Sequence, residues 1–414
     1  MRVAHLLRKL DPAEWSGTET AIQRLFDGLR SNGVDPVVYC PKLAGEGNGD
    51  PLASSGFEVQ RFRAFVPILG LSRQRRHQLV SVGGNLMSFD LIHSLWRERE
   101  LSVMHAHTLG RIGGIALTIA KQRRLPFVVT IHGGVLDLPA KIKQSFNSPM
   151  DRGWEWGKLF GFLFQSHRLF CDADAILTCN GTEAALLQKQ FPTKRVMVQP
   201  HGVPLEIYRA DQRHAALEAF PQICRRQVLL SLGRIDPIKN QSWLLEQAPE
   251  VFKRYPRALL VLAGPCTDEP YGEQIKRTIR ARGFQDRVLL TGGLPPNDPR
   301  VVGLLQCAEA LILPSLSETF GLVILEAWAA GTPVLSARAS GPAALIQDGH
   351  NGWLFDLEQP QTFHDALAHT LDQPATAKEM AQRGALITER HSVNALAATL
   401  KGLYEELIEE KRCT

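Results

Sequence analysis

Short runs of apolar residues alternate with helical stretches along most of the 414-residue chain. This alternation is typical of parallel α/β sheets, in which a helix connects each strand to the next. In the first half the pattern predicts strands near Val3–Leu7, Pro36–Cys40, Glu58–Arg63, Val103–His107, Phe127–His132, Ala175–Cys179 and Val196–Pro200. In the second half it predicts strands near Val228–Leu232, Ala258–Ala263, Val288–Thr291, Ala310–Leu313, Val334–Ser336 and Trp353–Phe355. The chain is longer than one hydrophobic core usually serves, so we expect two doubly wound domains.

A polar segment that contains Pro204 and Pro221 separates the two sets of strands. Because proline and polar residues interrupt regular structure, residues 204–226 are the expected interdomain connection. The predicted domains are therefore residues 1–203 and residues 227–391. Residues 392–414 are expected to form a further helix with one apolar face, which carries Leu396, Leu400, Leu403, Tyr404 and Leu407 at helical spacing.

The most informative stretch follows the predicted strand at residues 308–314. A polar loop comes next, and residues 322–330 are then apolar except at Glu326 and contain no helix breaker, which predicts a buried helix. The backbone N–H groups of residues 320–322 would lie free at the N-terminus of this helix. Free N–H groups and the helix dipole both favour a phosphate at such a position.

Glu326 is the sharper clue, because it is the one charge in this apolar run. An isolated buried carboxylate is energetically unfavourable, so it needs a partner. A ribose diol offers two hydroxyl donors to the two oxygens of a carboxylate. An Arg or Lys partner inside the protein is the alternative for this glutamate taken alone.

Glu318 and Glu326, on either side of Phe320-Gly321, resemble the paired-glutamate motif of the retaining glycosyltransferases of family 4. The resemblance covers most of the chain and implies the GT-B fold. In that fold two Rossmann-like domains face a cleft, and the C-terminal helix crosses back to the first domain. The resemblance also implies that Glu318 contacts the donor sugar and that Glu326 binds the ribose. The residues that would hold the sugar and the diphosphate between them are Thr319, Phe320, Gly321 and Leu322.

Further candidates in the second half lie where predicted strands end, which is where ligands bind in open α/β sheets. Arg234 and Lys239 suit a diphosphate, which gathers negative charge as the sugar departs. Together with Gly233 they resemble the G-R…K element of the family, and solvated loop charges are the alternative for either cation alone. Gly264 and Gly292 end the next two strands and would let a nucleobase approach the backbone.

The first half offers a loop and two histidines. Gly17 lies in a turn that resembles the acceptor-side loop of the family, although Ser16 replaces the usual first glycine. His132 ends a strand, and its position together with the resemblance implies contact with the donor sugar; His107 follows the same logic. A structural hydrogen bond is the alternative for each histidine. His105 and His107 share one face of a strand, but no carboxylate or third ligand nearby indicates a metal, so no metal site is predicted.

Two other sequence features narrow the assignment. Asp172-Ala173-Asp174 spells the DxD of metal-dependent transferases, but it precedes a strand instead of ending one, so we do not interpret it as a metal site. Ser340 and Ala344 stand where the family commonly has a glycine and a glutamate. Whatever that glutamate supports is absent here or is supplied by another residue.

Composition and charge indicate where the protein is located and what kind of partner it has. No stretch approaches the roughly 18 apolar residues of a membrane span, and charges near the N-terminus argue against a signal peptide. Seven scattered cysteines favour neither a disulfide framework nor a zinc site. We therefore expect a cytoplasmic protein. Residues 51–150 carry 13 Lys and Arg against 5 Asp and Glu, which favours an anionic partner on the first domain.

Within that basic region, residues 61–76 interleave apolar residues with five arginines. This pattern suggests docking on the inner face of an anionic cell membrane. The alternative is that the apolar residues pack in the core or line the acceptor site. Nucleic acid is not an expected partner.

The sequence thus predicts a retaining, metal-independent glycosyltransferase that needs no cofactor beyond its donor, a nucleotide-diphosphate sugar. The expected acceptor is a glycan or a lipid-linked molecule of cell-surface polysaccharide or glycoconjugate synthesis. A nucleotide-sugar epimerase or hydrolase of the same fold is one alternative. A non-catalytic sugar-binding subunit is another.

Overall fold

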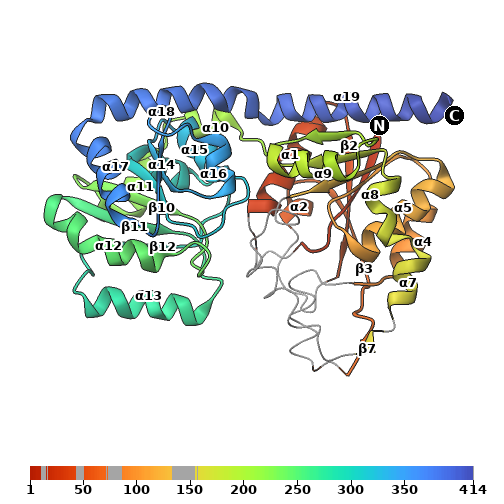
Figure 1. Ribbon diagram of the computed structural model, residues 1–414, viewed down its shortest axis with the longest axis horizontal. Helices are drawn as coiled ribbons and strands as arrows, with labels where there is room; N and C mark the ends of the chain where they lie inside the picture. Colours follow the sequence, from red (N-terminus) through yellow and green to blue (C-terminus); the bar gives the residue numbers. More distant parts are fainter. Residues whose placement is uncertain are drawn as a thin grey trace. The chain divides into compact units, whose positions relative to one another are not determined.

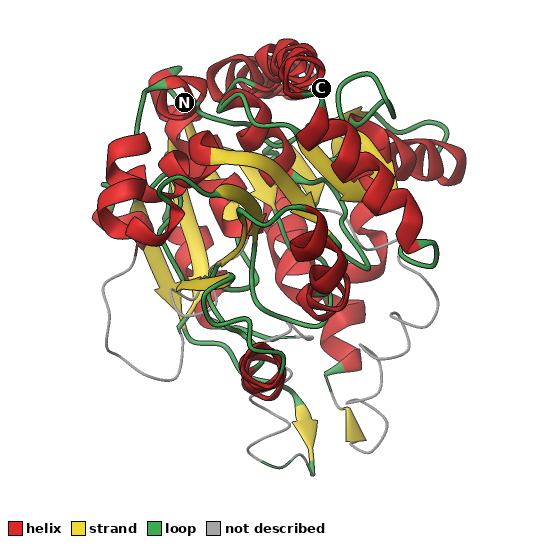
Figure 2. Ribbon diagram, turned by 90° about the vertical axis from the view of Figure 1, so that its left-hand side faces the viewer, coloured by secondary structure: helices red, strands yellow, loops and turns green. Residues whose placement is uncertain are grey.

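The computed structural model describes residues 1–10, 15, 17–42, 51–70, 72, 86–132, 154–155 and 157–413. The chain divides into two compact units. Unit 1 comprises Met1–Pro200 together with Asn394–Thr414, and unit 2 comprises His201–Val393. In both units helices lie on the two sides of a layer of strands (Figures 1 and 2). The expected fold class, two Rossmann-like parallel sheets, is confirmed.

Unit 1 contains a seven-stranded parallel sheet with the spatial order β3-β2-β1-β5-β6-β8-β9. Its strands are β1 (Arg2–Leu6), β2 (Asp35–Pro41), β3 (Glu58–Phe62), β5 (Leu101–Ala106), β6 (Phe127–Ile131), β8 (Ala175–Thr178) and β9 (Val196–Val198). Its helices include α1 (Gly17–Ser31), α2 (Pro51–Ser54), α4 (Asp90–Arg97), α5 (Gly110–Arg123), α7 (Lys158–Leu163), α8 (Leu169–Asp172) and α9 (Gly181–Gln190). A short antiparallel pair, β4 (Ile68–Leu69) with β7 (Trp154–Glu155), was not predicted.

Alternation along the strands of unit 1 builds two hydrophobic clusters. On β1, Ala4 and Leu6 belong to one cluster and Val3 to the other, because successive side chains of a strand point to opposite faces. Helix α19 (Val393–Cys413), the last blue helix in Figure 1, completes the second cluster. Its buried residues there are Ala397, Leu400, Leu403, Tyr404 and Leu407. The C-terminal helix therefore returns to the first domain, as the family resemblance implied.

Unit 2 contains a six-stranded parallel sheet with the order β12-β11-β10-β13-β14-β15. Its strands are β10 (Gln227–Leu232), β11 (Ala258–Ala263), β12 (Val288–Gly292), β13 (Ala308–Leu313), β14 (Val334–Ala337) and β15 (Trp353–Phe355). Its longer helices are α12 (Gln241–Arg254), α13 (Glu269–Ala281), α14 (Pro299–Cys307), α15 (Leu322–Ala329), α17 (Pro360–Asp372) and α18 (Pro374–Thr388). Asp268 and Asp298 cap α13 and α14 by accepting backbone hydrogen bonds.

Residues 204–226, which the sequence assigns to the connection, carry two short helices, α10 (Leu205–Arg209) and α11 (Arg213–Ala219). Leu205, Tyr208 and Ala216 are buried. Gln306 of α14 hydrogen-bonds to the carbonyl groups of Tyr208 and Ala210. These contacts place the segment within unit 2 instead of leaving it as a free linker.

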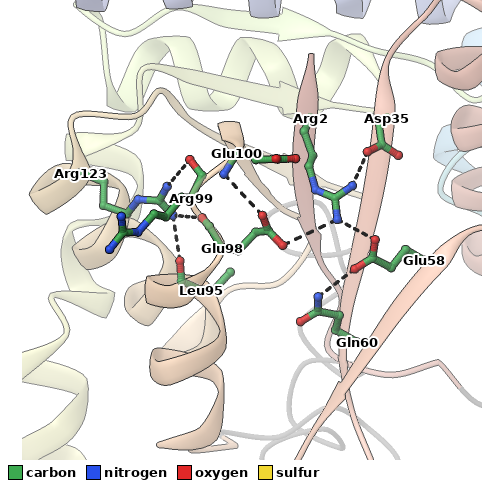
Figure 3. A network of polar contacts seen from close by, with 9 residues as sticks. All are labelled: Arg2, Asp35, Glu58, Gln60, Leu95, Glu98, Arg99, Glu100 and Arg123. Atoms are coloured by element: carbon green, nitrogen blue, oxygen red, sulfur yellow. Dashed lines mark hydrogen bonds and ion pairs between the residues drawn. The ribbon is translucent and has the colours of Figure 1, made fainter.

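A charged network occupies the amino ends of the strands in unit 1 (Figure 3). Arg2 at the start of β1 pairs with Asp35 at the start of β2 and, at 2.6 Å, with Glu58 at the start of β3. Hydrogen bonds from Gln60 and Arg2 lower the pKa of Glu58. Ligands of open α/β sheets bind at the opposite, carboxyl ends, so this network joins strands and is not a candidate site.

The DxD segment also has structural roles. Asp172 pairs with Lys121 at 2.8 Å and with Arg168, and these partners lower the pKa of its carboxyl group. Asp174 accepts a hydrogen bond from the backbone N–H of Phe127 and pairs with Lys411 of α19. Both carboxylates therefore connect elements of unit 1.

Most of the described apolar side chains in the proposed membrane segment, residues 61–76, pack inward. Phe62, Val66 and Ile68 are buried in the first cluster of unit 1, and only Phe65 is exposed. Arg73, Arg75 and Arg76 lie outside the described residues. The buried side chains cannot enter a lipid headgroup layer, so this part of the expectation is corrected. Across the described residues, no helix combines the length and apolar character that spanning a membrane requires.

Candidate active site

The candidate site of unit 2 lies at the switch point of its sheet. The two central strands, β10 and β13, lie side by side. From β10 the chain continues to β11 on one side, and from β13 it continues to β14 on the other side, so it leaves the two strands in opposite directions. Crevices at such points are the usual ligand sites of open α/β sheets. The loops after β10 and β13 meet here, because the N–H of Leu316 donates to the carbonyl oxygen of Ile238 at 2.8 Å.

Side chains of the two loops form ion pairs at this point. Lys239 Nζ lies 2.5 Å from Glu318 Oε2, and both side chains are mostly shielded from solvent. Arg234 lies 3.0 Å from Asp236, whose other carboxylate oxygen accepts from the backbone N–H groups of Ile238 and Lys239. The structure therefore brings together Arg234, Lys239 and Glu318, three residues that the sequence singled out.

Asp236 was missed in the sequence, although it orients both candidate cations. An acidic residue two positions after an arginine in a loop is common and carries no pattern of its own. Its role becomes visible only when the turn is folded and the carboxylate faces two backbone N–H groups.

Helix α15 opens at Gly321, whose φ of +88° disfavours any residue with a side chain. Glycine has no side chain to occupy the N–H groups of the first turn, so these groups are suited to an anionic ligand. Phe320 and Leu322 are buried on either side of it, and the ring of Phe320 packs edge-on against His201 with 4.8 Å between centroids. The loop that contains Thr319 is thus anchored by Phe320.

Glu326 is buried one turn further along α15, with 6% of its surface exposed. It lies among the apolar residues Leu325, Ala327 and Trp328, as the sequence predicted. A ribose remains the proposed partner of its carboxylate.

The glycines at the ends of β10, β11 and β12 differ in how much space a side chain would have at each position. A Cβ at Gly264 would lie 2.0 Å from the carbonyl oxygen of Gly233, so close strand packing alone requires glycine there. At Gly292 a Cβ would meet nothing within 4 Å. A Cβ at Gly233 would meet the side chain of Lys239 at ordinary contact distance. Of the three glycines, Gly292 therefore lies beside open space that a ligand could use.

The unusual Ser340-Gly341 pair supports the loop that carries Glu318. The N–H of Gly341 donates to the carbonyl oxygen of Glu318 at 2.8 Å, and the Ser340 hydroxyl donates to the same oxygen at 3.3 Å. Ser340, which departs from the family pattern, thus adds a hydrogen bond that a glycine could not make.

In unit 1 the two candidate histidines meet at the carboxyl ends of neighbouring strands. His107 follows β5, His132 follows β6, and His107 Nδ1 lies 2.9 Å from His132 Nε2. The second ring nitrogen of His107 lies 2.9 Å from Nδ1 of His5 on β1. Gly17 begins α1, and a Cβ there would meet nothing within 4 Å.

His5 corrects the expectation that no third nitrogen ligand lies nearby. Ring nitrogens of His5, His105 and His107 all lie within 4.8 Å of one another. Both nitrogens of His105 are already hydrogen-bonded, however, one to Tyr404 Oη at 2.5 Å and one to Thr130 Oγ1 at 2.6 Å. A metal would have to displace these bonds, so hydrogen bonding accounts for the cluster better than metal coordination does.

Two parallel Rossmann-like sheets with an anion-suited switch point are the architecture of GT-B glycosyltransferases. Two family models match the chain: "Glycosyl transferase 4-like domain" over residues 16–202 and "Glycosyl transferases group 1" over residues 217–387. Between them they cover most of the chain, which therefore belongs to the family 4 type of glycosyltransferases.

Individual proteins agree with this assignment. D-inositol 3-phosphate glycosyltransferase of Corynebacterium glutamicum (strain R) is 26% identical over 361 residues, which cover 83% of this chain and 80% of that protein. D-inositol 3-phosphate glycosyltransferase 2 of Catenulispora acidiphila is 29% identical over 336 residues, with 78% and 72% covered. Among solved structures, Anabaena Alr3699/HepE in complex with UDP has a TM-score of 0.73 at 16% identity and covers 98% of this chain and 100% of that chain.

Proposed function

We propose that this glycosyltransferase moves a sugar from a nucleotide-diphosphate sugar to an acceptor, with retention of configuration and without a metal ion. The observation that carries the proposal is the contact between Lys239 and Glu318 across the switch point of unit 2. It brings a cation suited to the diphosphate next to a carboxylate suited to the sugar, and both lie in loops beside the free N-terminus of α15.

In this proposal each group has a separate task. Glu326 accepts hydrogen bonds from the ribose, and Arg234, Lys239 and the first turn of α15 hold the diphosphate. Glu318 orients the sugar. Electrostatic stabilisation of a leaving group in a preorganised site is a large source of rate acceleration, so the two cations act mainly as the bond to the diphosphate breaks.

The bond between the anomeric carbon and the diphosphate oxygen breaks, and a bond from the acceptor oxygen to that carbon forms on the same face. The acceptor proton passes to an oxygen of the departing diphosphate, which balances the step without a protein nucleophile. The donor is the only cosubstrate in this scheme. Activity that survives removal of divalent ions by EDTA would support the absence of a metal.

UDP is the first nucleotide to test, because Alr3699/HepE was solved in complex with UDP. For the acceptor, a glycan or lipid-linked molecule of cell-surface synthesis is the first candidate. A phosphorylated polyol is the second, because the two relatives described above are named as D-inositol 3-phosphate glycosyltransferases. The excess of basic residues in residues 51–150 favours an acceptor that carries phosphate in either case.

We also propose peripheral association with the inner face of an anionic membrane, through a different surface from residues 61–76. Phe89, Trp96, Phe162 and Leu163 on and beside α4 and α7 are each more than half exposed. The ring of Phe89 also lies edge-on to that of Phe160 on α7, with 5.7 Å between centroids. Exposed apolar surfaces of this kind mark interaction sites.

The direct test of the activity is a thermal-shift panel of nucleoside diphosphates and nucleotide sugars. A ligand at 100 times its dissociation constant stabilises the folded state by about 2.7 kcal/mol. The stabilising donor is then incubated with and without acceptors, and the products are analysed. Transfer product that forms only with an acceptor supports the proposal. Epimerised or hydrolysed donor without an acceptor supports the first alternative, and binding without turnover supports a non-catalytic subunit.

A further inference from the structure

Three arginines stand directly before three neighbouring strands of unit 2. Arg226 precedes β10, Arg257 precedes β11 and Arg287 precedes β12, and these strands lie side by side in the sheet. Because adjacent strands are about 4.8 Å apart, the three residues form a row along the amino edge of the sheet, which we call the arginine row. The candidate donor site lies after the carboxyl ends of the strands, so the row is at the opposite end of the sheet.

Hydrogen bonds to backbone carbonyl groups join the strand ends. Nη2 of Arg226 donates to the carbonyl oxygen of Asp286, the residue directly before Arg287, at 3.0 Å. Arg257 donates to the carbonyl oxygen of Arg225, the residue directly before Arg226, at 3.1 Å through Nε and at 2.9 Å through Nη2. These bonds hold the side chains of the row at one edge of the sheet.

Arg287 is held from two directions. It donates to the carbonyl oxygens of Ala258 and Tyr255 at 3.0 and 3.1 Å. Its guanidinium carbon lies 4.2 Å from the centroid of the Phe252 ring, and stacking of this kind fixes the plane of the group. The guanidinium of Arg287 is therefore oriented before any ligand binds.

No carboxylate among the described residues balances the positive charge of the row. Every hydrogen bond of the three guanidinium groups goes to a backbone carbonyl oxygen, and none of the three forms an ion pair in the described part of the chain. Burial, and then the positive charge of the nearby Arg226, lower the pKa of Arg287. The two guanidinium groups therefore repel each other in the free protein.

Arg226 also has N–H groups to offer to a ligand. A guanidinium carries five N–H donors, and Arg226 uses one of them within the residues that the structure describes. Its Nε is buried and has no acceptor there. A buried donor without an acceptor is unfavourable, so an acceptor oxygen beside Arg226 would stabilise the row.

The amino edge of the sheet in unit 1 has a different arrangement (Figure 3). Arg2 at the start of β1 pairs with Asp35, with Glu58 and, at 3.7 Å, with Glu98, so carboxylates balance its charge. In unit 2, Asp286 is exposed and forms no ion pair with a described residue. Joining the strand ends therefore does not by itself account for the unbalanced charge of the arginine row.

We propose that the arginine row binds a ligand that carries phosphate groups, at a site separate from the donor site. A phosphate accepts two parallel hydrogen bonds from one guanidinium, and its negative charge would offset the repulsion between Arg226 and Arg287. Three arginines before adjacent strands offer donors to more than one phosphate group. This inference goes beyond the proposed function and does not rest on it, because no residue of the donor site takes part.

The first experiment measures binding of pyrophosphate to the full-length protein by isothermal titration calorimetry, at neutral pH and constant ionic strength. Pyrophosphate also resembles the diphosphate of a donor, so the titrations use Lys239→Ala as the background. This background should still bind pyrophosphate. Adding Arg226→Gln should weaken the binding about tenfold, the equivalent of one hydrogen bond to a charged group.

Two further variants complete the series. Arg257 is exposed, so Arg257→Gln should leave the fold intact and weaken the binding as well. Arg277→Gln is the matched control, because Arg277 is exposed on α13 and, like Arg226, donates one hydrogen bond to a backbone carbonyl. It should bind pyrophosphate like the background, and cooperative unfolding without ligand shows that each variant is folded.

Three results of the titrations would overturn the proposal. The first is that the Lys239→Ala background does not bind pyrophosphate, which would leave the arginines as partners of backbone carbonyl groups only. The second is undiminished binding in both Arg226→Gln and Arg257→Gln. The third is an equal loss in Arg277→Gln, which would show an effect of net charge and not of the row.

The second experiment distinguishes a free ligand from a lipid headgroup by sedimentation with vesicles of phosphatidylglycerol. We expect Arg226→Gln to sediment like the wild type, because the membrane surface proposed above lies in unit 1. Loss of sedimentation in Arg226→Gln would assign the row to a lipid surface and overturn the proposal of a free ligand. Neither experiment requires sugar transfer, so failure of the proposed function would leave both results valid.

Discussion

Glu318 and Glu326 have different surroundings, and this difference predicts different mutant phenotypes. Glu318 lies 2.5 Å from Lys239 in the loop before α15, whereas Glu326 is buried on the helix itself. We expect Glu326→Ala to weaken binding of the free nucleoside diphosphate, because it removes the proposed ribose acceptor. Glu318→Ala should instead lower turnover, because its proposed partner is the transferred sugar. Titrating each variant with the nucleoside diphosphate and with the intact donor measures both effects.

The control for Glu318→Ala is Glu273→Ala, which removes a carboxylate paired with a lysine on the exposed helix α13. That change should leave binding and turnover as in the wild type. Equal losses for both ligands in both active-site variants would contradict the division of labour.

Lys239 is expected to act on the departing diphosphate. Lys239→Ala should lower turnover by about a hundredfold, the order found when one preorganised donor is removed from a developing negative charge. Binding of a nucleoside monophosphate should change much less, because this ligand lacks the second phosphate. Lys276→Ala on α13 is the matched control, since Lys276 forms a comparable but exposed ion pair with Glu273. Wild-type turnover in Lys239→Ala would reject the assignment.

The candidate ligand-binding residues of unit 2 could be predicted from the sequence because they lie close to one another along the chain. Glu318, Gly321 and Glu326 occupy one loop and one helix, so their spacing identifies them in the sequence. Asp236 and His5 could not be found in this way. Asp236 acts through backbone N–H groups that converge only in the folded turn, and His5 is 102 positions away from His107, its partner.

Helix α19 contributes a major part of the core of unit 1, so shortening one of its buried side chains should destabilise the fold. Leu403 is 4% exposed and belongs to the cluster that includes Val3 and Phe26. Leu403→Ala should lower the free energy of unfolding by about 2–5 kcal/mol, the usual range for buried leucines. Leu386→Ala on α18 is the matched control, because Leu386 is 72% exposed. Denaturant unfolding measures both variants, and equal midpoints would contradict the packing described for α19.

The two buried histidines His5 and His105 in the sheet of unit 1 should make the free energy of unfolding depend on pH. Burial lowers the pKa of both His5 and His105 well below the ordinary value of about 6.5. The unfolded chain therefore takes up protons below about pH 6.5 that the native protein does not, so stability falls as the pH falls through this region. Each histidine contributes a slope of about 1.4 kcal/mol per pH unit once its unfolded form is protonated.

Urea unfolding at pH 7.5, 6.0 and 5.0 measures this slope. His5→Asn lacks one of the two groups, so its slope between pH 6 and 5 should be smaller by about 1.4 kcal/mol per unit. An unchanged slope in the variant would mean that His5 is not responsible.

Most of the strands were predictable because short, mainly apolar runs bounded by polar loops, such as Ala258–Ala263, have few other uses in an α/β protein. All thirteen predicted strands of the two sheets are present. Strands β4 and β7 have two residues each, which is too short to show a recognisable pattern of apolar and polar residues. They also pair across a long sequence separation. Helices α10 and α11 were missed because they are short and lie beside prolines, Pro204 before α10 and Pro221 after α11. Only their packing within unit 2 reveals a buried side.

At the scale of the whole molecule, the basic excess and, among the described residues, the exposed large aromatic side chains both lie in the first half of the chain. Residues 51–150 carry the basic excess, and α4 lies within that range. The exposed aromatic residues occur on and beside α4 and α7, which Figure 1 shows on the same side of unit 1. Sequence alone pointed instead to residues 61–76, because a local pattern of apolar and basic residues does not reveal which apolar side chains the core will bury.

We therefore predict that the protein sediments with anionic vesicles at low salt through Phe89 and Phe162, which are 53% and 73% exposed. Binding should weaken at high salt, because ions screen the attraction between basic side chains and lipid phosphates. The double variant Phe89→Ser, Phe162→Ser should bind about tenfold more weakly, since it removes two aromatic side chains from the headgroup boundary. Leu386→Ser in unit 2 is the matched control and should bind like the wild type. Absence of binding to anionic vesicles at low salt, or full binding by the double variant, would remove this surface as the anchor. Equal binding to neutral vesicles at any salt concentration would show that the basic residues do not contribute.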